Sequence, residues 1–210
     1  MLIVNQLKTE LLRYNDVIRL TPNDSIAYVK RGMIYFKLAQ IDESIQDFDR
    51  AATLDPLLTP YLWQRGLSYY YAGRYEEGAE QFTVDLTVNP HDAEETIWCY
   101  LCMACWQGVS AARDALLVVE KEPRLIVRAI YELYAGRATV EEVLKSGSTD
   151  RDRFYSHLYV GLYYEAAGEK KRSRNHIAQA VASFKLTDYM WHVARVHQQL
   201  REDHSPVAEP

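Results

Sequence analysis

The sequence lacks most features that mark an enzyme, a disulfide-rich domain or a membrane protein. Its 210 residues contain no His-Glu-x-x-His motif, no glycine-rich phosphate loop and no Gly-x-Ser-x-Gly motif. Only three cysteines are present, all in one short segment, which is no basis for a disulfide framework. No apolar run approaches the ~18 residues that a membrane span needs. We therefore expect a soluble protein that is not an enzyme and uses no cofactor.

Positive charge is also scarce, with 24 Lys and Arg against 29 Asp and Glu and a formal net charge of −5. Surfaces that bind nucleic acid are usually basic, so the charge predicts no nucleic-acid partner. The first residues hold too short an apolar run, and Glu10 comes too early, for a secretory signal. The compartment stays open: cytoplasmic, or an organelle or envelope compartment if a presequence has been removed.

What the sequence does contain is a pattern that repeats at a constant interval. Pro22, Pro56 and Pro90 are evenly spaced along the chain. Their interval is that of a tetratricopeptide repeat, about 34 residues, which forms a pair of antiparallel helices and buries its apolar face against neighbouring pairs. The matching positions are Tyr28, Gly32, Tyr35, Ser44, Phe48 and Ala51 in one repeat, and Leu62, Gly66, Tyr69, Gly78, Phe82 and Asp85 in the next.

The glycines of this pattern predict a specific packing contact. Gly32 and Gly66 occupy the same point of their first helices, where a glycine costs ~1 kcal/mol relative to alanine. Two such glycines in register indicate a helix–helix contact too close for a side chain. Phe48 and Phe82 lie on the facing second helices and are expected to fill the space beyond that contact.

The repeat predicts an all-α fold: a tetratricopeptide-type right-handed helical solenoid of antiparallel helix pairs, with capping helices at both ends. After Pro90 the pattern decays, and it returns around Gly161. Helices are expected at about 25–38, 42–54, 59–72, 76–88, 92–106, 111–120, 124–135 and 138–146. We expect a single domain over 1–202, made of an N-terminal cap (2–20), two regular repeats (25–90), degenerate pairs (91–148), a third regular repeat (150–184) and a C-terminal cap (187–201), followed by a disordered tail (203–210).

The order of these elements resembles the NlpI-type bacterial lipoproteins. The resemblance rests on two regular repeats, a slipped repeat containing residues 97–101, a short pair around 132–136, and a late repeat with residues 154–155 and 161–164. It implies a homodimeric helical adaptor that brings clients to a protease or hydrolase and does no chemistry itself. Unlike that family, this sequence has no signal segment and no cysteine near its start to carry a lipid, so no direct membrane insertion is expected.

Two short segments carry alternative interpretations. Cys99, Cys102 and Cys105 have a metal-like spacing, but their neighbours are apolar and thiols are often buried, so core packing is favoured over a metal or redox role. The basic run 170–174 falls at a helix start, where positive charge opposes the helix dipole. Neutralisation by Glu165 and Glu169 on a solvated face is favoured over binding to an acidic partner segment.

The concave face formed by the first helices is the candidate site for a protein partner. Tyr69 takes the core position, so at least one of Tyr70 and Tyr71 is expected outside the core, where aromatic residues anchor interfaces. Apolar side chains replace the lysine and asparagine with which chaperone-binding repeats grip a terminal carboxylate, so such a clamp is not expected. The alternatives are that this face packs against a cap or a twofold mate, or that the chain is a permanent structural subunit or assembly factor of a larger complex. The predicted partner-binding residues are Val29, Lys30, Met33, Phe36, Lys37, Trp63, Gln64, Leu67, Tyr70 and Tyr71.

Overall fold

A computed structural model describes residues 2–184 and 188–202. These described residues form twelve α-helices and one short 3-10 helix, with no strand among them, which confirms the predicted all-α class. Their contacts divide the chain into two compact units, residues 1–90 and 91–210, and each unit is described by itself. The tail predicted for 203–210 lies outside the described residues.

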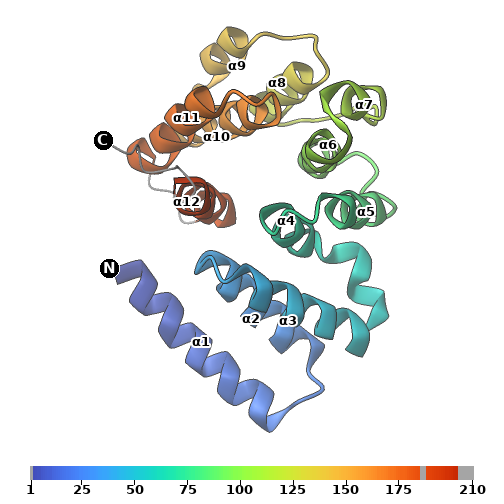
Figure 1. Cartoon of the computed structure of the whole chain (residues 1–210), viewed down its shortest axis with the longest axis vertical. Coiled ribbons are helices and arrows are strands. Elements are labelled where there is room, and N and C mark those ends of the chain that lie inside the picture. Colours follow the sequence, from blue (N-terminus) through green and yellow to red (C-terminus); the bar gives the residue numbers. More distant parts are fainter. Residues whose placement is uncertain (1, 185–187, 203–210) are drawn as a thin grey trace, which may run out of the picture. The chain divides into compact units, whose positions relative to one another are not determined.

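In the first unit each helix packs against its neighbour in the sequence (Figure 1). The predicted helix at 59–72 is wrong in its first part, because Pro56 and Pro60 lack the N–H that a continuous α-helix requires, and this stretch begins as a 3-10 helix. The elements are α1 (Leu2–Leu20), α2 (Ser25–Lys37), α3 (Ile41–Leu54), η1 (Pro56–Tyr61), α4 (Trp63–Tyr71) and α5 (Tyr75–Asp85).

The repeat glycines lie at close helix contacts, as the spacing predicts. A Cβ atom on Gly66 would lie 2.7 Å from Cε2 of Phe82, closer than real Cβ contacts come. On Gly32 it would lie 3.2 Å from the carbonyl oxygen of Ser44 and 3.3 Å from the ring of Phe48. The Ser44 hydroxyl also donates a 2.8 Å hydrogen bond to the Gly32 carbonyl oxygen, which ties α3 to α2 at this point.

A second repeated feature is an arginine on the first helix of a repeat, which bonds both to the helix before it and to the helix after it. On α2, Arg31 donates to the Asn15 side chain of α1 at 2.9 Å and to both carboxylate oxygens of Asp47 on α3 at 2.7 and 2.8 Å. Helix α1 therefore makes to α2 the kind of contact that α3 makes to α4. The same bridge recurs one repeat later, where Arg65 on α4 donates to Asp49 at 3.2 Å and to Gln81 at 2.7 Å.

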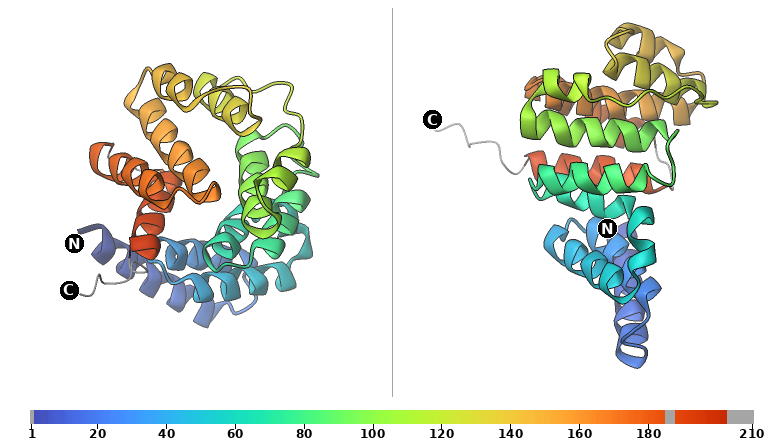
Figure 2. Two further views of the ribbon diagram at one scale, coloured as in Figure 1. Left: turned by 45° about the horizontal axis from the view of Figure 1, so that its top comes forward. Right: turned by 90° about the vertical axis from the view of Figure 1, so that its right-hand side faces the viewer.

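The second unit is less regular, with α8 and α9 forming a shorter pair against the long α10 (Figure 2). The helix predicted for 111–120 is wrong beyond its first turn, because α7 ends at Asp114. The following segment is held without helix by the Tyr131 hydroxyl, which donates to Leu117 and accepts from the Val119 N–H. The elements are α6 (Ala93–Gln107), α7 (Val109–Asp114), α8 (Leu125–Tyr134), α9 (Val140–Ser146), α10 (Asp150–Ala166), α11 (Lys170–Ser183) and α12 (Tyr189–Glu202).

The regular contact returns between α10 and α11. A Cβ atom on Gly161 would lie 2.8 Å from Cδ1 and Cγ1 of Ile177. Ile177 is buried and takes the place that Phe48 and Phe82 hold in the first unit. The return of the repeat pattern in the sequence thus corresponds to a return of the close helix pair.

Candidate functional site

The ten residues predicted to bind a partner lie on α2 and α4, and two contacts show that their side chains adjoin. The Gln64 amide nitrogen lies 4.0 Å from the Met33 sulfur. The rings of Phe36 and Tyr71 meet edge to face with centroids 5.7 Å apart. Predicted side chains of the two first helices therefore pack against one another in the first unit.

Much of that predicted surface is buried. The expectation that Tyr70 or Tyr71 lies outside the core is wrong: Tyr70 is 0% exposed and Tyr71 is 6% exposed. Seven of the nine residues of α4 are buried, so this short helix is covered on more than one face. Phe36, Gln64 and Leu67 are buried as well. Of the remaining predicted residues, Lys30 is exposed, and Val29, Met33, Lys37 and Trp63 are half-buried.

The charge on this surface comes from two lysines of α2. Burial lowers the pKa of Lys37, and the carboxylate of Glu10 on α1 acts in the opposite direction. Lys30 is exposed one helical turn before Met33. The accessible part of the surface is therefore a mixture of aliphatic, aromatic and positively charged side chains.

The cysteine segment lies within α6, and its middle thiol belongs to the core. Cys102 is 0% exposed, while Cys99 and Cys105 are half-buried. Burial raises the pKa of the Cys102 thiol well above its ordinary value, which disfavours the thiolate needed for metal binding or nucleophilic chemistry. Within the described ranges, no group of three or more His, Cys, Asp or Glu side chains is placed to hold a metal ion.

The basic run forms the exposed start of α11. Lys170, Lys171, Arg172 and Arg174 are exposed. Arg172 pairs with Glu169 at 2.9 Å, as expected. Glu165 instead pairs with Arg201 of α12 at 2.7 Å, so its carboxylate serves a contact between helices. The run is thus only partly neutralised by the carboxylates that the sequence suggested.

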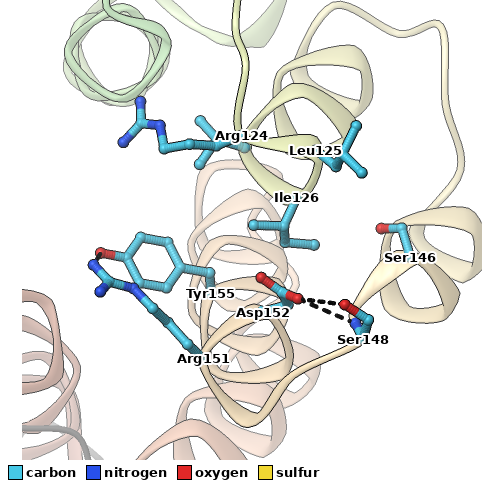
Figure 3. A pocket seen from close by; sticks show the side chains of 9 residues that line it. Arg124, Leu125, Ile126, Ser146, Ser148, Arg151, Asp152 and Tyr155 are labelled. Atoms are coloured by element: carbon cyan, nitrogen blue, oxygen red, sulfur yellow. Dashed lines mark hydrogen bonds between the residues drawn. The ribbon is translucent and has the colours of Figure 1, made fainter.

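The structure also contains a cavity that the sequence did not predict. It has a volume of about 540 Å³ and lies in the second unit, where α8 begins, α9 ends and α10 begins (Figure 3). Its lining residues come from three segments: Arg124 to Val127; Ser146 and Ser148; and Arg151, Asp152 and Tyr155. These segments are separated in the sequence, and the Ser146-Gly147-Ser148 turn is the only local signal near them.

Two arginines line this cavity and are held differently. Arg124 donates to Glu122 at 2.7 and 2.8 Å and to Glu94 at 2.5 Å, so two carboxylates fix its guanidinium. Arg151 lies 3.6 Å from the nearest carboxylate oxygen of Asp188 and 3.5 Å from the Tyr155 hydroxyl, and its side chain is 66% exposed. Arg151 is therefore the more weakly held of the two cations.

The acidic residue in the lining is engaged with its own helix terminus. The Asp152 carboxylate accepts hydrogen bonds from the N–H groups of Ser148 and Thr149 and from the Ser148 hydroxyl, at 2.9 to 3.2 Å. The Thr149 backbone hydrogen bond is the main reason why the pKa of Asp152 lies below its usual value. Figure 3 shows the hydrogen bonds that join one oxygen of this carboxylate to Ser148. No helix in the described part of the chain is long and apolar enough to cross a membrane.

Comparison with known proteins supports the repeat. The tetratricopeptide repeat family matches residues 26–56, which span α2 and α3. The chain is similar to the Hsp70-Hsp90 organizing protein of Triticum aestivum, with 30% identity over 81 residues. That alignment covers 39% of this chain and 14% of the relative, so the likeness concerns a part of each protein. The resemblance to NlpI-type lipoproteins stays a prediction, because neither match concerns that family.

Proposed function

We propose that this protein is a non-enzymatic adaptor that binds a segment of a partner protein on the α2 and α4 surface of its first unit. The observation that supports this most is the helix-pair repeat matched at residues 26–56, since such repeats serve protein–protein contact and carry no chemistry of their own. The accessible residues of the surface are of the kinds that anchor interfaces. They are Val29, Lys30, Met33, Lys37 and Trp63.

The chemistry of this surface favours an extended or helical segment that is apolar and carries negative charge. Lys30 and Lys37 supply positive charge, and Met33 and Trp63 supply adaptable and aromatic contact area. The relative's name refers to Hsp70 and Hsp90, but a chaperone tail is not part of this proposal, because apolar side chains stand at the inner positions of α2 and α4. Following the NlpI-type resemblance, the partner would be a client, a protease or a hydrolase.

A second candidate function is a permanent subunit or assembly factor of a larger complex. Large apolar side chains on the outside of the first unit favour it. On α1, Leu2 is 88%, Leu12 66% and Leu20 73% exposed, and Leu57 on η1 is 81% exposed. In this alternative the partner covers α1 and η1, and the α2 and α4 surface makes no contact with it.

Site-specific photocrosslinking separates these functions. A benzoylphenylalanine in place of Lys30 or Met33 reports on the α2 and α4 surface, and one in place of the exposed Gln46 on α3 is the matched control. The adaptor proposal predicts crosslinks to one protein from the first two positions and none from the control. Benzoylphenylalanine is also placed at Leu12 and Leu57. Crosslinks from these two positions alone would favour the subunit function and contradict the adaptor.

A further inference from the structure

We propose that the cavity between α8, α9 and α10 is a second binding site, which takes a peptide segment carrying an Asp or Glu side chain next to a large aliphatic one. This inference rests on the proposed adaptor function, which supplies the protein partner. It concerns a different unit of the chain and other residues than the α2 and α4 surface.

The carboxylate of such a segment would bind Arg151. The ion pair between Arg151 and Asp188 is long at 3.6 Å, whereas a well-formed guanidinium–carboxylate pair is about 2.8 Å. An incoming carboxylate can therefore form a shorter pair without breaking a strong one. Arg124, by contrast, already makes close contacts to Glu94 and Glu122 and would serve as part of the wall.

The Tyr155 hydroxyl provides a second contact for the same carboxylate. Burial raises the pKa of Tyr155 to about 12, with the negative charge of Glu94 acting in the same direction. The phenol is therefore protonated at neutral pH and can donate its O–H while its oxygen accepts from Arg151. A carboxylate bound beside the Arg151 guanidinium and the Tyr155 hydroxyl would receive donors from both.

The opposite side of the cavity is aliphatic. Leu125, Ile126 and Val127 come from the first turn of α8, and Leu125 is 68% exposed. Figure 3 shows Leu125 and Ile126 on the α8 side and Arg151 and Tyr155 on the α10 side. A residue next to the bound acid would thus meet an apolar wall. The volume of about 540 Å³ lies within the ~300 to 1,000 Å³ typical of ligand pockets.

Charge complementarity favours a single carboxylate over a polyanion. Asp152 lines the same cavity, and the whole chain has a formal charge of −5. A row of phosphates would meet this negative charge, whereas one acidic side chain on the Arg151 side avoids Asp152. The structure therefore favours an acidic–aliphatic peptide over nucleic acid.

The test uses the full chain and a defined probe, the peptide acetyl-Gly-Ser-Glu-Leu-Ser-Gly-amide, followed by 15N chemical-shift titration. We expect saturable shifts at Ile126, Val127 and Tyr155. Peptides with Gln in place of Glu, or Ser in place of Leu, should bind about tenfold more weakly, because each loses the contact to one wall. The variants Arg151→Ala and Leu125→Ser should show the same loss. Both residues are largely exposed, so neither change should unfold the chain.

Arg153→Ala is the matched control, because Arg153 lies on the same helix, is 51% exposed and lies outside the cavity lining. Its binding should equal that of the unchanged chain. Equal binding of the Glu and Gln peptides, or competition by inorganic phosphate or a short DNA as strong as that of the Glu peptide, would overturn the proposal. Absence of peptide binding, while Lys30 and Met33 still crosslink to a partner, would remove this site and leave the adaptor function standing.

Discussion

In residues 1–90 the same side-chain contacts recur from one repeat to the next, whereas in the described part of residues 91–210 the α10–α11 pair repeats the glycine contact and the other helix pairs are held by contacts of their own. Arg31 and Arg65 make equivalent bridges in the first unit, but the equivalent position of the following repeat is Cys99, which cannot continue them. The second unit relies instead on particular long-range hydrogen bonds. The Tyr134 hydroxyl donates to the Tyr159 carbonyl, and the Tyr159 hydroxyl donates to Glu94.

This difference separates two ways of holding helices together. Repeated contacts specify one packing distance, set by a glycine against a ring, and they are readable from the sequence. Individual contacts allow helices of unequal length, such as the seven-residue α9 against the 17-residue α10. The cavity of the second unit lies where the termini of such unequal helices meet. The surface proposed for the first unit thus belongs to the regular repeats, and the one proposed for the second unit lies where the repeat is irregular.

The largest effect is expected from breaking the arginine bridge. Arg31→Met leaves the carboxylate of Asp47, whose side chain is 6% exposed, without its bidentate partner, and should lower the free energy of unfolding by about 3 kcal/mol. Arg65→Met should cost about 1 kcal/mol, because its partners are the neutral Gln81 and the 47% exposed Asp49. Urea unfolding measures both changes. Equal losses of unfolding free energy in the two variants would contradict the prediction that the bridge to the buried Asp47 is the stronger one.

A smaller effect is expected from filling the glycine contacts. Gly66→Ala drives a Cβ atom into the ring of Phe82 and should cost about 2 kcal/mol, while Gly161→Ala meets Cδ1 and Cγ1 of Ile177, an aliphatic chain that can rotate more easily than a ring, and should cost about 1 kcal/mol. Hydrogen exchange should locate the first loss in residues 1–90 and the second in residues 91–210. Phe82→Leu should restore part of the loss in Gly66→Ala. Tolerance of alanine at both positions would contradict the close contacts.

The first unit should lose stability as the pH rises. Asp85 is 0% exposed, and burial raises its pKa to about 7, so the folded chain holds a proton that the unfolded chain releases near pH 4. The stability that this protonated carboxyl group contributes is fully present below pH 4 and is lost as the pH rises to about 7. Asp85→Asn should therefore raise the free energy of unfolding at pH 8 by about 1.5 kcal/mol and have little effect at pH 4. A stabilisation that is the same at both pH values would contradict this assignment.

The His157–His176 pair of the second unit should respond to pH in the opposite direction to Asp85, with the smallest effect. His157 and His176 lie with their Nδ1 atoms 3.0 Å apart. Burial lowers the pKa of both, and the charge of His176 lowers that of His157 further. The unfolded chain then binds protons that the folded chain does not, so stability falls as the pH drops below about 6.5. His176→Gln should reduce this acid loss by about 1 kcal/mol in unfolding measured at pH 5 and 7.5. An unchanged acid loss would rule the pair out as its source.

The sequence predicts the regular part of the fold because the repeat places its signals locally. Proline spacing and glycine register define α2 to α5, and the structure contains the close contacts at Gly32, Gly66 and Gly161. The predicted helix bounds are wrong at two places, where a proline or a contact from a distant residue prevents the helix that the local pattern indicates. Pro60 lies in the 3-10 helix that precedes α4, and Tyr131 holds the segment after α7 in a non-helical form.

The candidate surfaces are predicted less completely, for a physical reason. Helical periodicity identifies the faces of α2 and α4, but it does not show that α4 is covered on several sides. One of Tyr70 and Tyr71 is therefore expected at the surface, whereas both are buried. The cavity in the second unit depends on how three helix ends meet. No spacing within one segment indicates that Arg151 and Leu125 face the same space.

The most direct test of the account is photocrosslinking from Lys30 and Met33 on α2, with Gln46 on α3 as the control. Both α2 positions should crosslink to the same partner protein and to the same short segment of it, as mapped by mass spectrometry, while Gln46 gives no product. Equal labelling from Gln46, or crosslinks from Leu12 and Leu57 without any from Lys30 and Met33, would contradict the claim that the regular repeat is the partner-binding surface.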